Sequence, residues 1–161
     1  GALVDDGQMN TVLSYIEKGK SEGAELLCGG SRALESTGGF YVEPTLFDNV
    51  TNDMTIAQEE IFGPVISAIA FDSFEEAMTI ANDTIYGLAA GIWTSDVNTA
   101  HHAGRRLRAG NVWINCWDGS DITTPFGGFK QSGFGRDRSL HALEKYTELK
   151  TVWLKLGAPK A

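Results

Sequence analysis

The first apolar pattern along the chain has the spacing of an α-helix. Between residues 8 and 18 apolar side chains recur at i, i+3, i+4 and i+7, which predicts an amphipathic helix with one buried face. Asp5 or Asp6 stands where the N-cap of this helix is expected. The apolar run 26–28 is followed by two glycines, which predicts a short strand ending in a turn. The helix is predicted to bury Met9, Val12, Leu13 and Ile16.

Beyond residue 64 the predicted strands and helices alternate. Residues 65–71 are almost continuously apolar, as in a strand covered on both faces, and further strands are predicted at 88–93 and 111–115. Residues 73–76 form a capping box that opens one helix, and a second helix is predicted over 97–108. This order predicts two right-handed crossovers and a parallel sheet, and therefore an α/β fold. The helices are predicted to bury Phe74, Ala77, Met78, Val97, Ala100, Gly104 and Leu107.

The end of the chain has a different pattern. Leu140, Leu143 and Tyr146 predict a last short helix, and residues 147–156 read as a long strand with apolar residues on both faces. An exposed apolar strand invites aggregation, so we expect residues 147–156 to pair across a subunit boundary in a homo-oligomer. The tail 157–161 is expected to be frayed.

The charge and composition exclude several classes of protein. A net charge of −8 over 161 residues argues against binding to nucleic acid or to an anionic membrane surface. We find no 18-residue apolar run and no charged-then-apolar leader, so we expect a cytoplasmic protein outside the membrane. The two cysteines, Cys28 and Cys116, form neither a disulfide framework nor a metal-ligand pattern, and no metal site is predicted.

Glycine-rich loops supply the candidate chemistry. Residues 125–135 contain four glycines among aromatic and cationic side chains, and residues 59–64, Glu-Glu-Ile-Phe-Gly-Pro, are their counterpart upstream. The two segments are predicted to form two walls of a ligand site. Gly128 and Gly133 have the gap of a phosphate-binding loop, but Phe134 and Gly135 stand where Lys and Ser or Thr are required. The sequence therefore carries no phosphate-binding motif of its own.

Three further candidates each allow two interpretations. Glu60 and Phe62 are either a surface carboxylate and a core anchor, or a carboxylate for a ribose diol and a ring that covers a flat ligand. The loop 117–122 is either a tight Asp-Gly turn, or a site where Asp121 and Trp117 attract a substrate ammonium group. Cys116 is either an inert thiol or a nucleophile, and no histidine partner can be assigned to it.

Four motifs match one enzyme family in order and spacing: residues 59–64, 86–88, 110–115 and 125–135. Through them the chain, from about residue 1 to 156, resembles the last third of members of the aldehyde dehydrogenase superfamily. The stretch 124–145 is most similar to the aminoaldehyde branch, whose members oxidise γ-glutamyl-γ-aminobutyraldehyde and related products of polyamine breakdown.

The resemblance implies roles for individual residues. Glu60 would bind the nicotinamide-side ribose, and Phe62 and Leu88 would contact the nicotinamide of NAD or NADP. Phe126 would line the substrate tunnel, while Asp121 matches an Asp of the aminoaldehyde branch. Asp137 stands where many relatives carry a glutamate proposed to relay a proton, and its shorter side chain argues against that role.

The resemblance also implies what the chain lacks. The nucleophilic cysteine, the general-base glutamate, the oxyanion-holding asparagine and the domain that binds most of the cofactor would all lie upstream, so no catalytic residue is assigned. We expect residues 1–146 to be part of a catalytic domain and the isolated chain to be inactive. The expected function is that of a C-terminal fragment of an NAD(P)-dependent aldehyde dehydrogenase that oxidises an aldehyde, in particular an aminoaldehyde, to the acid. The alternative is a catalytically silent binding or assembly module.

Overall fold

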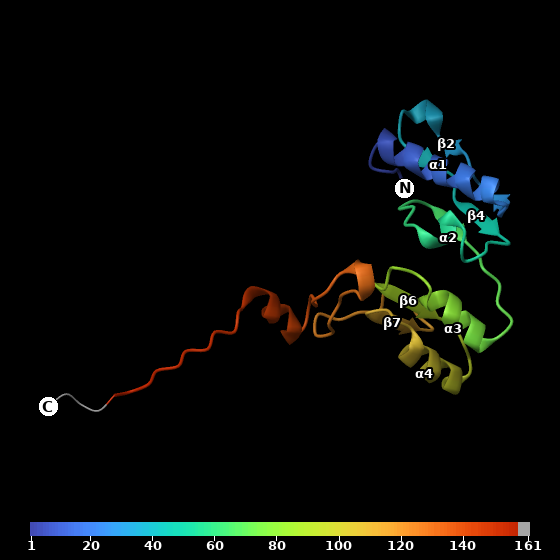
Figure 1. Ribbon diagram of the computed structural model, residues 1–161. Coiled ribbons are helices and arrows are strands. Elements are labelled where there is room, and N and C mark those ends of the chain that lie inside the picture. Colours follow the sequence, from blue (N-terminus) through green and yellow to red (C-terminus); the bar gives the residue numbers. More distant parts are fainter. Residues whose placement is uncertain (158–161) are drawn as a thin grey trace. The chain divides into compact units, whose positions relative to one another are not determined.

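The computed structural model describes residues 1–157, and the chain divides into two compact units, Gly1–Thr84 and Ile85–Ala161 (Figure 1). Among the described residues, no helix is long and apolar enough to cross a membrane. The first unit contains, in chain order, α1 (Asp6–Glu22), β1 (Glu25–Cys28), β2 (Arg32–Ala33), the 3₁₀ helix η1 (Glu35–Thr37), β3 (Tyr41–Val42), β4 (Thr45–Asp48), α2 (Thr55–Gln58), β5 (Val65–Ser67) and α3 (Phe74–Asn82). The second contains β6 (Ala89–Ile92), α4 (Val97–Arg106), β7 (Asn111–Ile114) and the 3₁₀ helices η2 (Lys130–Ser132) and η3 (Leu140–Tyr146).

Helix α1 confirms the first prediction and is longer than the predicted segment. Asp5 is its N-cap, and the Asp5 carboxylate accepts a hydrogen bond of 2.8 Å from the backbone N–H of Gln8. The helix ends at Gly23, which adopts the left-handed conformation (φ 99°) that glycine permits without strain. Met9, Val12 and Ile16 are buried, as predicted, and Leu13 is partly buried against the same core.

The core of the first unit lies between α1 and a three-stranded sheet of order β1-β4-β5 (Figure 1). The predicted strand at 26–28 is confirmed as β1, which pairs antiparallel with β4, while β4 pairs parallel with β5. Phe47 of β4 is fully buried and carries the largest buried side chain of this core. Burying a side chain of this size contributes about 2–3 kcal/mol.

The predicted strand at 65–71 is only partly correct. β5 covers Val65–Ser67, Ile66 is 65% exposed and Phe71 is 60% exposed, so the segment is not covered on both faces. β5 pairs with β4, whereas β6 pairs with β7 in a separate sheet. The predicted crossover through α3 therefore does not join paired strands, because an apolar run specifies burial without specifying the neighbouring strand.

Helix α3 begins as the capping box predicts, with one difference. The Ser73 hydroxyl accepts a hydrogen bond of 3.2 Å from the N–H of Glu76. The Glu76 carboxylate accepts its hydrogen bond from the N–H of Asp72, at 2.8 Å, one residue before the cap. Met78 is buried, and Phe74 and Ala77 are half-buried, as the helical pattern predicts.

In the second unit, β6, α4 and β7 form the predicted crossover, with β6 and β7 parallel and in register from Ala89 with Asn111 to Ile92 with Ile114 (Figure 1). The mixed α/β class with parallel strand pairs is thereby confirmed. Ala103 of α4 is buried, but Val97 is 63% exposed, contrary to prediction. Val97 is the first residue of α4, and helical periodicity does not show where along a helix its packing against other elements ends.

The chain after residue 139 is exposed. The predicted last helix is confirmed as η3, yet its apolar residues Leu140, Leu143 and Tyr146 are 83%, 60% and 85% exposed. Residues 147–156 have no partner strand within the described residues, and Figure 1 shows them as an extended segment. A strand requires a partner, so the strand and its pairing between subunits stay predictions. Of the predicted frayed tail, residues 158–161 lie outside the described part.

Candidate functional site

The first candidate element, which we name the cofactor loop, comprises residues 59–63. It begins where α2 ends, because Glu59 leaves the helix in an extended conformation (φ −110°, ψ 150°). Ile61 is 8% exposed and anchors the loop in the core. A hollow of about 300 Å³ lies beside the loop, lined by the loop itself and by side chains of α2 and β5.

Glu60 and Phe62 both line this hollow. Phe62 is 75% exposed and has a positive φ of 53°, so its interpretation as a core anchor is wrong, and Ile61 takes that place. Glu60 is exposed, and no hydrogen bond to its side chain is present among the described residues. An unpaired carboxylate and an exposed ring at one hollow can bind a diol and cover a flat ring.

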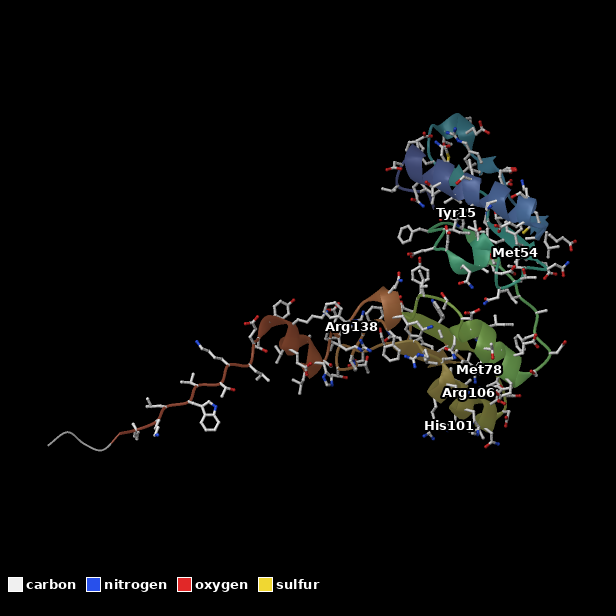
Figure 2. The ribbon with its side chains drawn as sticks, viewed as in Figure 1. Tyr15, Met54, Met78, His101, Arg106 and Arg138 are labelled. Atoms are coloured by element: carbon white, nitrogen blue, oxygen red, sulfur yellow. The ribbon has the colours of Figure 1, made fainter. Side chains whose placement is uncertain are left out.

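Helix α1 holds the cofactor loop in place. The Tyr15 hydroxyl donates a hydrogen bond of 2.7 Å to Glu59 Oε2, and Gln8 Nε2 lies 3.2 Å from the carbonyl oxygens of both Ile61 and Phe62 (Figure 2 labels Tyr15). Neither residue was predicted from the sequence. The available signal was their spacing on α1, since residues 8 and 15 are seven apart and therefore lie on one helix face.

The glycine loop 125–135 packs against the starts of β6 and β7, as expected of a loop folded against a surface. The N–H of Phe129 donates to the carbonyl of Gly87 at 2.8 Å, and the N–H of Gly87 donates to the Ser132 hydroxyl at 3.0 Å. A Cβ on Gly110 would lie 1.8 Å from the carbonyl oxygen of Gly127. Only glycine permits this approach of two backbones.

The substrate loop, residues 117–122, carries an exposed aromatic surface. Trp117 is 61% exposed, and its ring centroid lies 5.1 Å from that of Trp113 at an interplanar angle of 53°. The indole N–H of Trp113 donates a hydrogen bond of 2.7 Å to the carbonyl of Gly119. Asp118 has a φ of 54°, a left-handed conformation that Asp tolerates in turns, and both interpretations of this loop stay open.

Asp121 closes the next turn of the same loop. One carboxylate oxygen, Oδ1, accepts hydrogen bonds from the N–H of Thr123 at 2.8 Å and from its hydroxyl at 2.6 Å. These bonds, the hydroxyl first, lower the pKa of Asp121 below its usual value, so the carboxylate is charged at neutral pH. Asp121 therefore has a structural role, and its charge is also available to a ligand.

Phe126 lines a second hollow, of about 240 Å³, along the flank of β7. The backbones of Phe126 and Asp137 exchange hydrogen bonds of 2.8 and 2.7 Å. The guanidinium carbon of Arg138 lies 5.4 Å from the Phe126 ring centroid, and Arg138 Nη1 donates to the Ser120 hydroxyl at 2.6 Å. Asp137 accepts a hydrogen bond from Lys145 at 2.5 Å, so its carboxylate is engaged in an ion pair.

The predicted cofactor residues belong to different units. Glu60 and Phe62 lie in the first unit, whereas Leu88 lies in the second and is 41% exposed. The carbonyl of Leu88 accepts a hydrogen bond of 3.1 Å from Asn111 Nδ2. The grouping of these three residues stays a prediction, as does the pairing of loops 59–64 and 125–135 as walls of one site.

Among the described residues, the remaining thiol and imidazole groups form no second site. Cys116 is exposed, His101 and His102 are exposed on α4, and His141 Nδ1 lies 3.2 Å from Glu144 Oε1 (Figure 2 labels His101). Within residues 1–157 no group of three or more His, Cys, Asp and Glu side chains could hold a metal ion. The described residues thus place no acid–base partner beside either thiol.

Comparison with known proteins identifies the family. The sequence profile of the aldehyde dehydrogenase family matches residues 1–152. The putative aldehyde dehydrogenase DhaS of Bacillus subtilis is 52% identical over 156 residues, which make up 97% of this chain and 31% of that protein. The chain spans about a third of the length of such relatives.

Solved structures agree with the sequence relatives. An indole-3-acetaldehyde dehydrogenase with NAD+ bound is 65% identical and superposes with a TM-score of 0.92, covering 97% of this chain and 32% of that one. A γ-glutamyl-γ-aminobutyraldehyde dehydrogenase from Burkholderia cenocepacia is 62% identical with a TM-score of 0.89, covering 93% and 30%. On this evidence the chain belongs to the aldehyde dehydrogenase family.

Proposed function

We propose that this chain is the C-terminal third of an NAD(P)-dependent aldehyde dehydrogenase, which oxidises an aldehyde to the carboxylic acid. The observation that carries the proposal is the hollow beside the cofactor loop, where Glu60 and Phe62 offer an unpaired carboxylate and an exposed ring. The nucleophile, the general base and most of the cofactor site would come from polypeptide outside these 161 residues.

In this proposal the chain binds and orients the cofactor and takes no part in bond making. The nicotinamide supplies the hydride acceptor. Glu60 accepts hydrogen bonds from the adjacent ribose hydroxyls, and Phe62 packs on the ring and excludes water from one face. Leu88 and Phe126 add apolar contacts to the cofactor and to the aldehyde.

For the substrate we propose an aminoaldehyde. The support is the substrate loop, where Asp121 keeps its negative charge and Trp117 presents an exposed ring, the two features that attract an ammonium group. The name of the Burkholderia relative points to the same class of substrate. Against it, another close relative is named for indole-3-acetaldehyde, which bears no ammonium group.

The test uses a full-length hybrid, in which this chain replaces the matching third of the Burkholderia relative. The hybrid is expected to form NADH from an aminoaldehyde. Glu60→Gln should raise the KM for NAD+ about tenfold, since hydrogen bonds to a charged acceptor contribute about 1.5–3 kcal/mol. Glu43→Gln, which changes an exposed glutamate outside the hollow, is the matched control. An unchanged KM in Glu60→Gln would contradict the cofactor role.

The alternative is a catalytically silent binding or assembly module. The purified 161-residue chain, offered NAD+ or NADP+ with aminoaldehydes and aliphatic aldehydes, is expected to form no reduced cofactor under either proposal. A hybrid that folds but remains inactive would favour the silent module. Turnover by the isolated chain that Cys116→Ser abolishes would contradict both proposals and make Cys116 the nucleophile.

A further inference from the structure

The two neighbouring carboxylates of the cofactor loop have different surroundings. Glu59 accepts the 2.7 Å hydrogen bond of Tyr15, whereas Glu60 has no partner among the described residues. Glu59 is in the extended conformation, in which successive side chains point to opposite sides of the backbone. Both residues line the hollow beside the loop, and the contact that ties Glu59 to α1 fixes the backbone from which the side chain of Glu60 extends.

One face of α1 makes three contacts with this loop. Gln8, Val12 and Tyr15 are spaced i, i+4 and i+7, and each of them touches a different part of the loop. Gln8 lies at the carbonyls of Ile61 and Phe62, and Val12 lies so close to Gly63 that a Cβ there would be 2.5 Å from Val12 Cγ2. Tyr15 is the contact at the beginning of the loop.

The loop needs such contacts because of its backbone conformation. Phe62 has a φ of 53°, in the left-handed region that non-glycine residues rarely adopt. A conformation of this kind persists only where the surroundings hold it. Without the contacts from α1, the loop would relax and Phe62 would leave the position it takes beside Glu60.

We infer that Tyr15 is a positioning residue of the cofactor site. It acts through Glu59 and sets the orientation of Glu60 and Phe62 toward the nicotinamide end of the cofactor. This inference rests on the proposed function, since it assigns Tyr15 to the same site. Loss of the hydroxyl weakens cofactor binding and leaves the chemical step of the enzyme unchanged.

The test is Tyr15→Phe, which removes the hydroxyl and keeps the half-buried ring. In the hybrid enzyme the KM for NAD+ is expected to rise about threefold to tenfold, which is the effect expected from the loss of one hydrogen bond. The kcat is expected to change less than about twofold. Tyr15→Phe and Glu59→Ala should be strongly non-additive, because both remove the same contact. Tyr41→Phe, on β3, is the matched control and should change nothing.

The outcomes separate this inference from the proposed function. If Glu60→Gln raises the KM for NAD+ and Tyr15→Phe does not, the inference is wrong and the cofactor role stands. If neither variant changes it, both fail. In the 161-residue chain itself, ¹⁵N relaxation should give lower order parameters for residues 60–63 in Tyr15→Phe than in Tyr41→Phe, and equal values would overturn the inference without any activity assay.

Discussion

Gly63→Ala is the most informative single substitution in the first unit. The added Cβ would lie 2.5 Å from Val12 Cγ2 and 3.0 Å from Val12 Cγ1, and Val12 is fully buried in the middle of α1. Valine in a helix has one strongly preferred rotamer, so its side chain cannot turn away. The loop cannot shift freely either, because the carbonyl of Pro64 accepts a 2.8 Å hydrogen bond from the N–H of Thr45.

The expected cost follows from this geometry. Overpacking of a closed core costs about 1–3 kcal/mol, and we expect Gly63→Ala to lie in the upper half of that range. Val12→Ala alone removes two buried methyl groups and should cost about 2 kcal/mol. The destabilisation of the double variant should be smaller than the sum of the two single destabilisations by at least about 1 kcal/mol. The smaller residue at position 12 makes room for the new methyl group.

The assay must report on the first unit alone. All four tryptophans, Trp93, Trp113, Trp117 and Trp153, lie in the second unit, so their fluorescence does not follow α1. Native-state hydrogen exchange of the amides around Ile16 measures the opening free energy of the buried part of this helix. If the costs of Gly63→Ala and Val12→Ala add within about 0.3 kcal/mol, the steric reasoning is refuted.

Three further predictions concern the second unit. Hydrogen bonds from the Thr99 hydroxyl and backbone lower the pKa of Asp96, the N-cap of α4. The charged carboxylate therefore stabilises α4 fully at pH values above the ordinary aspartate pKa of 3.8. This stabilisation is lost as the pH falls through the lower pKa that Asp96 has in the folded state. Asp96→Asn should therefore flatten the dependence of α4 exchange rates on pH below about 4, and an unchanged profile would contradict this. In the hybrid, Asp121→Asn with Trp117→Ala should raise the KM for an aminoaldehyde several-fold more than that for a neutral aldehyde of equal length. Trp153→Ser should shift the chain toward monomer in light scattering, since Trp153 is 93% exposed, and an unchanged mass would argue against pairing through 147–156.

Local structure was predicted well from the sequence, and pairing between distant segments was not. The caps at Asp5 and Ser73 are short-range hydrogen bonds, which depend only on residues three positions away. The pairing of β5 with β4, by contrast, depends on a contact between segments about twenty residues apart that no periodicity encodes. The same limit applies to Val97, because helical periodicity does not show which elements cover the first turn of α4.

The candidate site shows the same contrast between local features, which the sequence predicts, and long-range contacts, which it does not. Glu60 and Phe62 were selected through the family resemblance of loop 59–64, because residue type alone left a surface carboxylate and a core anchor as the other interpretation. The exposure of Phe62, and its exchange of roles with buried Ile61, depend on a positive φ that is not readable from residue type. Tyr15 was missed because its partner lies 44 residues away.

The exposed apolar residues of the second unit bear on the choice between enzyme part and independent module. Phe134 is 99% exposed and Leu149 is 107% exposed, while Trp117 leaves 61% of its surface to solvent. Scattered apolar residues are normal on any protein, but the large aromatic and aliphatic side chains exposed in succession over 147–156 support the predicted pairing of this segment with a partner. An assembly module and an enzyme part would both need such a surface. Only the enzyme part would also need an unpaired carboxylate and an exposed ring at a second place on the chain. Glu60 and Phe62 provide these two groups beside the hollow of the cofactor loop, and their presence favours the enzyme part over the assembly module.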